Sequence, residues 1–342
     1  MRLELNKIHN LNCLDGLKLL EDDSVDCCIT SPPYWRLRSY GTYPSIWDDD
    51  SDCEHSWEKI KRRGMTGGKN SKKVQTKGQQ NFQEFNDVEQ FFCKKCNAWK
   101  GDLGLEPTAE LYVKHICDIF DEVRRVLKPS GTLWLNLSDT YARQDDAFPT
   151  KSLCQIPTEI SREMIKRGWI LRNEIIWHKP NAMPHPVTDR FTGDYEKIFF
   201  FVKKEKYYFK QIREQLPPVL ENLHNFIQIE KNLTTVKKSK NILKTIENFL
   251  GTKEIGRNKR SIWSIHTEKL NNKHFAAYPQ KLVENCIESG CPENGLVLDI
   301  FIGSGTTARV AKIKRRNYIG FEINKKYVKM SQQRTLVSKE LF

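Results

Sequence analysis

Short apolar runs rich in β-branched residues alternate along this chain with stretches of helical periodicity. That pattern is typical of an α/β fold in which crossover helices cover a central sheet. We expect the strands of a seven-stranded sheet at Ile8–Cys13, Val25–Thr30, Thr132–Leu137, Arg172–Trp177, Glu196–Val202, Leu296–Phe301 and Asn317–Glu322. Between Pro107 and Lys128 apolar residues keep a 3.6-residue period, which predicts a helix that packs on the sheet and stops at residues 129–131.

Two stretches interrupt the alternation. Residues 47–101 hold a basic loop and four potential metal ligands, whereas residues 210–259 are polar, rich in Asn and Lys and predicted to be helical. The chain therefore divides into α/β parts at 1–46, 102–209 and 260–342, separated by these two insertions.

Charge adds a partner class to this picture. The formal net charge is +13, which favours a polyanionic partner. Much of it lies between Lys59 and Lys77, where eight basic residues and no acidic ones occur among glycines. No apolar stretch approaches the roughly 20 residues of a membrane helix, and the first six residues are too polar for a signal peptide. We expect a soluble, cytoplasmic protein that does not enter membranes.

Residues 295–307 read as a buried strand, a turn with Gly303 and Gly305, and the beginning of a helix. Glycine lets the backbone approach a ligand closely, and the first turn of a helix offers unpaired N–H groups. Glu322 ends the next predicted strand, where its carboxylate can accept both hydroxyls of a ribose. These features predict a nucleoside-binding crevice. Ala308 in place of a third glycine disfavours a nicotinamide-dependent oxidoreductase but leaves it as an alternative.

A proline loop follows another predicted strand at its carboxyl end, where open α/β sheets place their sites. It consists of Ser31, Pro32, Pro33 and Tyr34. Two prolines fix the backbone and remove two N–H donors, so the loop presents carbonyl oxygens beside a hydroxyl group and an aromatic ring. If the Ser31 hydroxyl and the Pro32 carbonyl accept the protons of an amine, its lone pair is localised for attack on a methyl sulfonium. A proline-rich surface turn is the structural alternative.

Together, the two motifs resemble those of the amino-group DNA methyltransferases, and their order along the chain resembles the β group. Further similar segments are 105–108, 131–136, 168–173, 176–181, 189–192 and 275–279. The resemblance implies a Rossmann-like, circularly permuted S-adenosylmethionine-binding sheet, with the catalytic motif N-terminal and the cofactor motif C-terminal. It also implies methyl transfer to the exocyclic amine of a flipped base in double-stranded DNA, and it makes residues 210–259 the expected target-recognition region.

The resemblance assigns roles residue by residue. The residues expected to hold the base are Ser31, Pro32, Pro33 and Tyr34. The residues expected to bind the cofactor are Asn12, Phe275, Pro279, Asp299, Phe301, Gly303, Gly305, Thr306, Thr307 and Glu322.

Two positions depart from the family pattern. Asn12 stands where the family usually has Asp, so an amide replaces a carboxylate near the cofactor adenine, and Ile300 replaces a proline. A serine at position 31 resembles the cytosine-N4 enzymes, whereas adenine-N6 enzymes more often carry Asp or Asn there. Cytosine N4 is the expected target and adenine N6 its close rival. RNA stays open as a substrate because the motifs describe an amine and not a sugar.

Four of the possible metal ligands form two pairs, Cys53 with His55 and Cys93 with Cys96, on either side of the basic loop. Two such pairs can close a tetrahedral zinc site, and four protein ligands leave no open position for catalysis. We predict a structural zinc, against the alternative of free thiols. A non-enzymatic zinc DNA-binding protein is a further alternative, but it leaves the proline loop and the glycine turn unexplained. A cognate restriction endonuclease and a second copy of the chain are candidate partners.

Overall fold

A central mixed sheet organises the chain in the computed structural model. The structure describes residues 3–37, 39–40, 42, 44–60, 90–143, 147–184, 186–214, 257–268 and 277–336. Within them the sheet has eight strands in the order β1, β14, β13, β2, β7, β9, β8, β12. Their bounds are Lys7–His9 (β1), Val25–Thr30 (β2), Leu127–Leu137 (β7), Ile170–His178 (β8), Tyr195–Val202 (β9), Ile262–Ser264 (β12), Leu296–Asp299 (β13) and Asn317–Phe321 (β14). Only β9 pairs antiparallel with its neighbours, so the sheet is mainly parallel.

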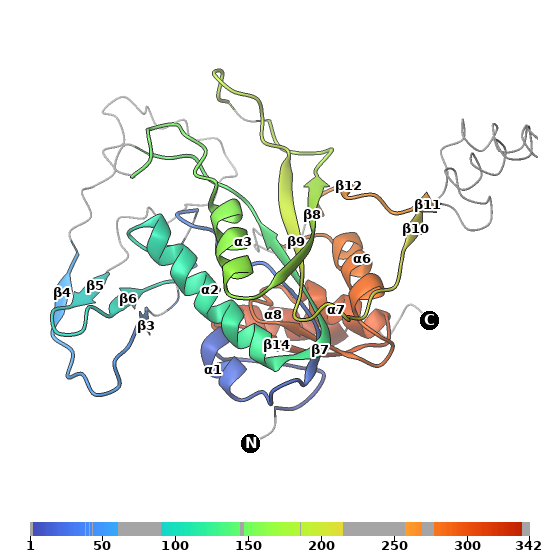
Figure 1. The fold of residues 1–342 in the computed structure, drawn as a ribbon, viewed down its shortest axis with the longest axis horizontal. Coiled ribbons are helices and arrows are strands. Elements are labelled where there is room, and N and C mark those ends of the chain that lie inside the picture. The colour runs from blue at the N-terminus through green and yellow to red at the C-terminus, as the bar shows by residue number, and fades with distance from the viewer. Residues whose placement is uncertain are drawn as a thin grey trace, which may run out of the picture.

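Helices cover both faces of this sheet, as expected for an α/β fold (Figure 1). They are α1 (Cys13–Lys18), α2 (Ala109–Val126), α3 (Ile156–Lys166), α6 (Gln280–Gly290), α7 (Thr306–Ile313) and α8 (Lys325–Leu336). Because side chains alternate along a strand, neighbouring residues enter different cores. Cys28 and Leu133 pack with α1, α2 and α3, whereas Cys27 and Trp134 pack with α6 and α7. Among the described helices, none is long and apolar enough to cross a membrane.

The helix predicted between Pro107 and Lys128 is α2. Its N-cap, Thr108, accepts a hydrogen bond from the Leu111 N–H at 3.2 Å, which satisfies a free donor of the first turn. The helix lies within the predicted bounds and ends two residues early, at Val126, because β7 begins at once at Leu127.

Two other predictions need correction. The strand expected at Ile8–Cys13 ends at His9, because Asn12 adopts an extended backbone and caps α1 with its side chain. The sheet has an eighth strand, β12, which pairs parallel with β8 at the edge. Three residues with one buried side chain give no readable alternation, which is why this strand was not predicted.

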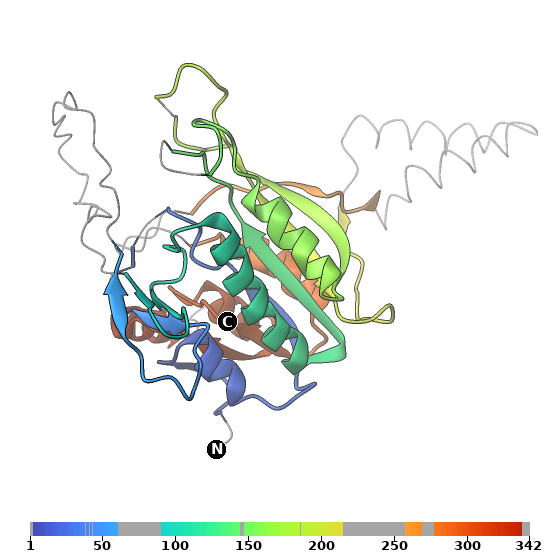
Figure 2. The same cartoon turned by 60° about the vertical axis from the view of Figure 1, so that its left-hand side comes forward.

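A second, small sheet lies beside α2 (Figure 2). Its four antiparallel strands follow the order β3, β6, β5, β4. Their bounds are Ser45–Trp47 (β3), Trp57–Lys59 (β4), Phe91–Cys93 (β5) and Trp99–Gly101 (β6). Most of this sheet falls within the insertion predicted at 47–101, and its first strand begins two residues earlier, at Ser45. The basic loop falls almost entirely outside the described residues.

The second insertion is described only at its ends. Arg213–Glu214 (β10) pairs antiparallel with Arg257–Asn258 (β11), and Glu214 forms ion pairs with Arg257 at 2.8 Å and Arg260 at 3.1 Å. The two ends of the segment predicted at 210–259 therefore meet at one place. The predicted helices within it lie outside the described residues.

Candidate functional site

Two loops meet because their strands are neighbours. β2 pairs in parallel with β13, so the loop after Thr30 and the loop after Asp299 leave the same edge of the sheet side by side. A pocket opens there, lined by Ser31 and Pro33 from the first loop and by Gly303 from the second. Carboxyl ends of central parallel strands are where α/β folds bind ligands. The two sequence motifs, separated by more than half of the chain, thus form a single site.

The second loop turns on two glycines with left-handed backbones. Gly303 has φ 48° and Gly305 has φ 80°. A Cβ atom on Gly305 would lie 2.7 Å from the Cβ of Ser331, so α8 packs too closely for a side chain there. Glu322 closes the turn by accepting hydrogen bonds from the Gly303 N–H at 3.1 Å and the Asn324 N–H at 2.7 Å. Burial raises the pKa of the Glu322 carboxyl to about 7.

Asp299 lies behind this turn and not on the pocket wall. Its carboxylate accepts hydrogen bonds from the hydroxyls of Thr30 at 2.8 Å, Tyr278 at 2.7 Å and Thr307 at 2.6 Å. It also accepts one from the Phe301 N–H at 3.1 Å. Burial raises the pKa of the Asp299 carboxyl. Thr30 immediately precedes Ser31, so Asp299 fixes the two loops relative to each other.

The Tyr34 side chain is held by a polar network. Its hydroxyl donates to Glu196 at 2.8 Å and accepts from the Ser31 hydroxyl at 3.0 Å and the Asn136 amide at 2.5 Å. Lys179 forms a short ion pair with the same glutamate. Burial, followed by the negative charge of Glu196, raises the pKa of Tyr34 well above its ordinary value, so the phenol stays protonated. The ring is thus anchored by its hydroxyl beside Ser31.

The backbone of the first loop is anchored from another side. The Pro33 carbonyl accepts a hydrogen bond from the Tyr112 hydroxyl on α2 at 2.8 Å. Gly104 packs against the same proline, where a Cβ atom would meet Pro33 at 3.0 Å. The Gly104 carbonyl accepts from the Arg36 N–H at 2.7 Å. The segment that follows β6 therefore supports the proline loop.

The predicted site residues occupy three kinds of position. Those that line the pocket are Asn12, Ser31, Pro33, Phe301, Gly303, Thr306 and Glu322. Those that lie behind it or beside it are Pro32, Tyr34, Pro279, Asp299, Gly305 and Thr307. Phe275 lies outside the described residues.

Asn12 uses its amide within the protein. The Oδ1 atom accepts from the Leu14 N–H at 3.0 Å as the cap of α1, and Nδ2 donates to the Ser45 hydroxyl at 3.0 Å. Asn12 lines the pocket, but its side-chain oxygen already accepts a hydrogen bond from within the protein.

Further residues complete the pocket wall. Ala277 and Tyr278 line it and lie within the predicted cofactor segment 275–279. Trp47 and Asp102 come from the small sheet and the residue after it. Asp102 is 8% exposed, and its Oδ1 has no hydrogen-bond partner among the described residues. Burial raises its pKa to about 6. No sequence pattern marks these two residues, because the small sheet itself was not predicted.

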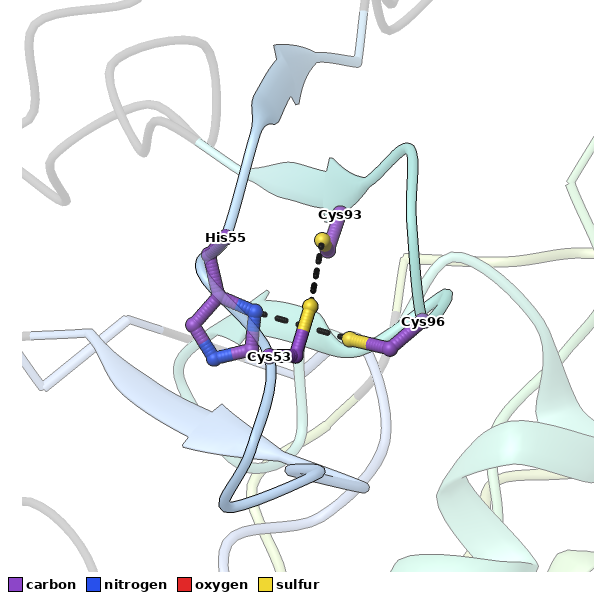
Figure 3. A group of neighbouring side chains, drawn as sticks. All are labelled: Cys53, His55, Cys93 and Cys96. Carbon is purple, nitrogen blue, oxygen red and sulfur yellow. Dashed lines mark hydrogen bonds between the residues drawn. The ribbon is translucent and has the colours of Figure 1, made fainter.

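The four predicted metal ligands come together beside β4 and β5 of the small sheet (Figure 3). The ligand atoms of Cys53, His55, Cys93 and Cys96 all lie within 4.8 Å of one another. None of the three cysteines forms a disulfide with another described residue. The arrangement brings the two halves of the insertion together, as the spacing predicted.

Comparison with known proteins identifies a family. The sequence profile of a family described as DNA methylase (N6_N4_Mtase) matches residues 25–333. The type II methyltransferase M.SmaI of Serratia marcescens is 27% identical, over 94% of this chain and 88% of that protein. M.Cfr9I of Citrobacter freundii, also a type II methyltransferase, is 28% identical, over 97% and 89%. These matches favour a methyltransferase over the nicotinamide-dependent alternative.

Solved structures share the fold. The PvuII DNA methyltransferase, described as cytosine-N4-specific, matches with a TM-score of 0.56 at 17% identity, over 97% of this chain and 87% of that one. A candidate DNA modification methylase of Thermus thermophilus, solved with S-adenosyl-L-methionine, matches with a TM-score of 0.53 at 18% identity, over 98% and 95%.

Proposed function

This chain belongs to the DNA methylase family of amino-group methyltransferases, and we propose that it transfers a methyl group from S-adenosylmethionine to the N4 amine of cytosine in double-stranded DNA. The observation that carries the proposal is the shared pocket, which Ser31 and Pro33 line on one side and Gly303 and Glu322 on the other. An amine held by the first loop and a nucleoside held by the second would face each other across it.

The pocket residues fit a cationic nucleoside. Glu322 offers carboxylate oxygens at the end of β14, suited to the hydroxyls of a ribose. Asp102 presents a buried oxygen without a partner among the described residues, suited to an ammonium or amine group of the same ligand. When bound, S-adenosylmethionine supplies an electrophilic methyl group. Phe301 and Tyr278 also line the pocket, and their rings would keep water away from a bound sulfonium.

Ser31 has the geometry of a proton acceptor. Its hydroxyl hydrogen is directed to the Tyr34 oxygen at 3.0 Å, which leaves the lone pairs of Ser31 Oγ for an N–H donor. Accepting that hydrogen bond would raise the electron density on the amine nitrogen as it attacks the methyl group, and the methylated amine would then release its surplus proton to water. Attack by nitrogen requires no covalent bond between enzyme and base. Cys27 and Cys28, on the preceding strand, are both fully buried and are not placed to form one.

The target base has to leave the duplex to reach this pocket, at a cost of a few kcal/mol. Tyr34 lies beside Ser31 and is anchored through Glu196, so its ring is a fixed surface on which a flipped base can stack. The serine at position 31 supports cytosine. Adenine N6 is the alternative target, since both amines have the same donor chemistry.

Two segments are proposed to meet DNA. The basic stretch from Lys59 to Lys77 would contact phosphates of any sequence, whereas residues 210–259, which leave the fold and return at β10 and β11, would read the recognition sequence. The protein would act in the cytoplasm. Partners that fit this role are a cognate restriction endonuclease directed at the same sequence and a second copy of the chain.

A transfer assay tests the proposal. Protein is incubated with S-adenosylmethionine labelled in its methyl group and with double-stranded DNA from an unmodified source. We expect label in the DNA, and a loss of about 10²-fold in turnover for Ser31→Ala, by analogy with other transition-state hydrogen bonds. Label in RNA but not in DNA, or equal turnover for Ser31→Ala, would refute the assignment.

A further inference from the structure

The cysteine and histidine cluster has the dimensions of a tetrahedral metal site. Zn–S bonds of about 2.3 Å and Zn–N bonds of about 2.0–2.1 Å place two sulfurs about 3.8 Å apart and a sulfur and a nitrogen about 3.6 Å apart. Cys53 Sγ and Cys93 Sγ are 3.8 Å apart, and Cys96 Sγ and His55 Nδ1 are 3.5 Å apart. Figure 3 shows the four side chains converging on one point. Closing the longer separations, up to 4.8 Å, requires only small side-chain movements.

The neighbouring groups are arranged as for metal ligands. His55 Nε2 bonds Asp49 Oδ1 at 2.8 Å, so the carboxylate fixes the tautomer that leaves Nδ1 free to bind a metal. The Lys95 N–H donates to Cys93 Sγ at 3.4 Å, which favours a thiolate. Asn97, with φ 63°, donates its N–H to the Cys93 carbonyl at 2.9 Å and closes a tight turn between the two cysteines. Exposed free thiols would need none of these contacts.

The half of the small sheet that carries these ligands has little support of its own. β4 and β5 have three residues each, and a two-stranded hairpin by itself is marginally stable. This half pairs with the rest of the sheet only through β6. A metal ion that joins Cys53, before β4, to Cys93, at the end of β5, would supply the missing cross-link.

The opposite half of this sheet forms a wall of the pocket. Trp47 ends β3 and Asp102 follows β6, and both line the pocket beside Gly303 and Glu322. The Trp47 indole N–H donates to the Gly101 carbonyl at 3.2 Å, and its ring stacks on His115 of α2 at 4.9 Å. The positions of Trp47 and Asp102 in the pocket wall thus depend on the pairing of β3 with β6.

The same segment continues to the proline loop. Glu106 accepts hydrogen bonds from the Gly104 N–H at 2.8 Å and from His115 at 3.1 Å, and its carbonyl accepts from the Trp35 indole at 3.1 Å. The Gln90 amide, which directly precedes β5, donates to the Leu105 carbonyl at 2.7 Å. An unbroken chain of contacts therefore runs from the cluster, through β5 and β6, to residues next to Ser31.

We propose that Cys53, His55, Cys93 and Cys96 bind one zinc ion, and that this ion holds Trp47, Asp102 and the segment 102–106 in place as a wall of the methyl-donor pocket. Zinc is therefore a structural part of the active site without touching a substrate. The identity of the pocket ligand rests on the proposed function, whereas the metal site and its coupling to the wall do not.

The metal site is tested on the full-length protein, purified without chelators. Elemental analysis should find about one zinc per chain, as for four-ligand structural sites. In competition with a chromophoric chelator, Asp49→Asn should weaken zinc binding by about 10–100-fold, because the carboxylate that orients His55 is lost. Asp52→Asn, an exposed carboxylate three residues away, is the matched control and should match wild type. Absence of zinc together with no uptake of added zinc overturns the site, as does equal affinity of Asp49→Asn and Asp52→Asn. Iron in place of zinc overturns the choice of metal.

The coupling is tested by hydrogen exchange, which needs no methyl donor. Asp49→Asn protein is titrated with zinc, and amide exchange is followed in peptides covering Arg36 and residues 102–106. Exchange there should accelerate at least about tenfold as zinc is withdrawn, because opening the sheet exposes these amides, while the β2 and β7 core stays protected. Unchanged exchange in 102–106, or equal acceleration in the core, contradicts the coupling. If exchange behaves as expected but zinc-loaded wild type binds no S-adenosylmethionine, the proposed function fails and this inference stands.

Discussion

Protonation of Glu322 should control how tightly the methyl donor binds. The carboxyl lines the pocket and has a pKa raised to about 7, because burial penalises its charged form. Two hydroxyls of a ribose both donate hydrogen bonds, so they require the ionised carboxylate as acceptor. Donor affinity should therefore rise with pH as Glu322 loses its proton.

The size of the effect follows from the ionised fraction. With a pKa of about 7, about 9% of the Glu322 carboxyl is ionised at pH 6 and about 91% at pH 8. Affinity for S-adenosylmethionine should thus rise about tenfold over this range, or about 1.4 kcal/mol. Asp102 also lines the pocket, but its pKa of about 6 adds at most about a factor of two over the same range.

The protein without ligand should respond in the opposite direction. Between pH 4.5, the ordinary pKa of a glutamate, and about 7, the native carboxyl keeps a proton that the unfolded chain has released. The free energy of unfolding therefore falls as pH rises through this window, by at most about 3 kcal/mol from this group. Bound S-adenosylmethionine should restore part of this free energy of unfolding, because its hydroxyls stabilise the ionised carboxylate of Glu322.

Calorimetric titrations with S-adenosylmethionine from pH 6 to pH 8 measure the rise in affinity with pH. The variant Glu322→Gln tests whether ionisation of Glu322 causes that rise. The amide cannot ionise and offers a single acceptor, so affinity should be at least about tenfold weaker at pH 8 and nearly independent of pH. Glu293→Gln, at an exposed position outside the pocket, should behave like wild type. If the affinity of the wild type does not depend on pH, or if Glu322→Gln shows the same tenfold rise, ionisation of Glu322 does not control binding.

Other side chains give equally direct predictions. Tyr34→Ala should lose about 1–3 kcal/mol of stacking on the flipped base while its affinity for S-adenosylmethionine is kept, and Tyr34→Phe should retain most of the stacking. A fluorescent base analogue at the target position measures the stacking, and equal signals for Tyr34→Ala and wild type would exclude it. Ser31→Ala should lower kcat far more than it weakens DNA binding, and a pure loss of DNA affinity would contradict its role as a proton acceptor. Asp299→Asn should lower the free energy of unfolding by about 1–3 kcal/mol, because an amide nitrogen cannot accept from the surrounding hydroxyls; urea titration measures this, and an unchanged midpoint would contradict its bridging role.

Strong local signals account for the parts of the fold that the sequence predicted. The strand Val25–Thr30 has the predicted bounds because a run of buried residues passes directly into the Ser31 loop with its prolines. The glycine turn was predictable because Gly303 and Gly305 both need left-handed backbones. β12 and the four short strands of the small sheet gave no such signal, since three residues are too few to show a period.

The site divides in the same way. The position of Ser31 and Glu322 at the pocket could be predicted because each directly follows a readable strand. Asp102 and Glu196 were missed because their roles depend on partners far along the chain, at the pocket and at Tyr34. The metal ligands are intermediate: their spacing predicted the cluster, but the supporting contact from Asp49 to His55 is visible only in three dimensions.

The position of the transferred methyl group decides whether this chain methylates the N4 amine of cytosine. DNA modified by the purified protein with deuterated S-adenosylmethionine is digested to nucleosides, which are separated by chromatography against synthetic standards and identified by mass spectrometry. We expect deuterated N4-methylcytosine. N6-methyladenine would keep the amine chemistry of the Ser31 loop and contradict the choice of base. Deuterated 5-methylcytosine would contradict the mechanism itself, because methylation at carbon requires a covalent cysteine adduct that this loop cannot form.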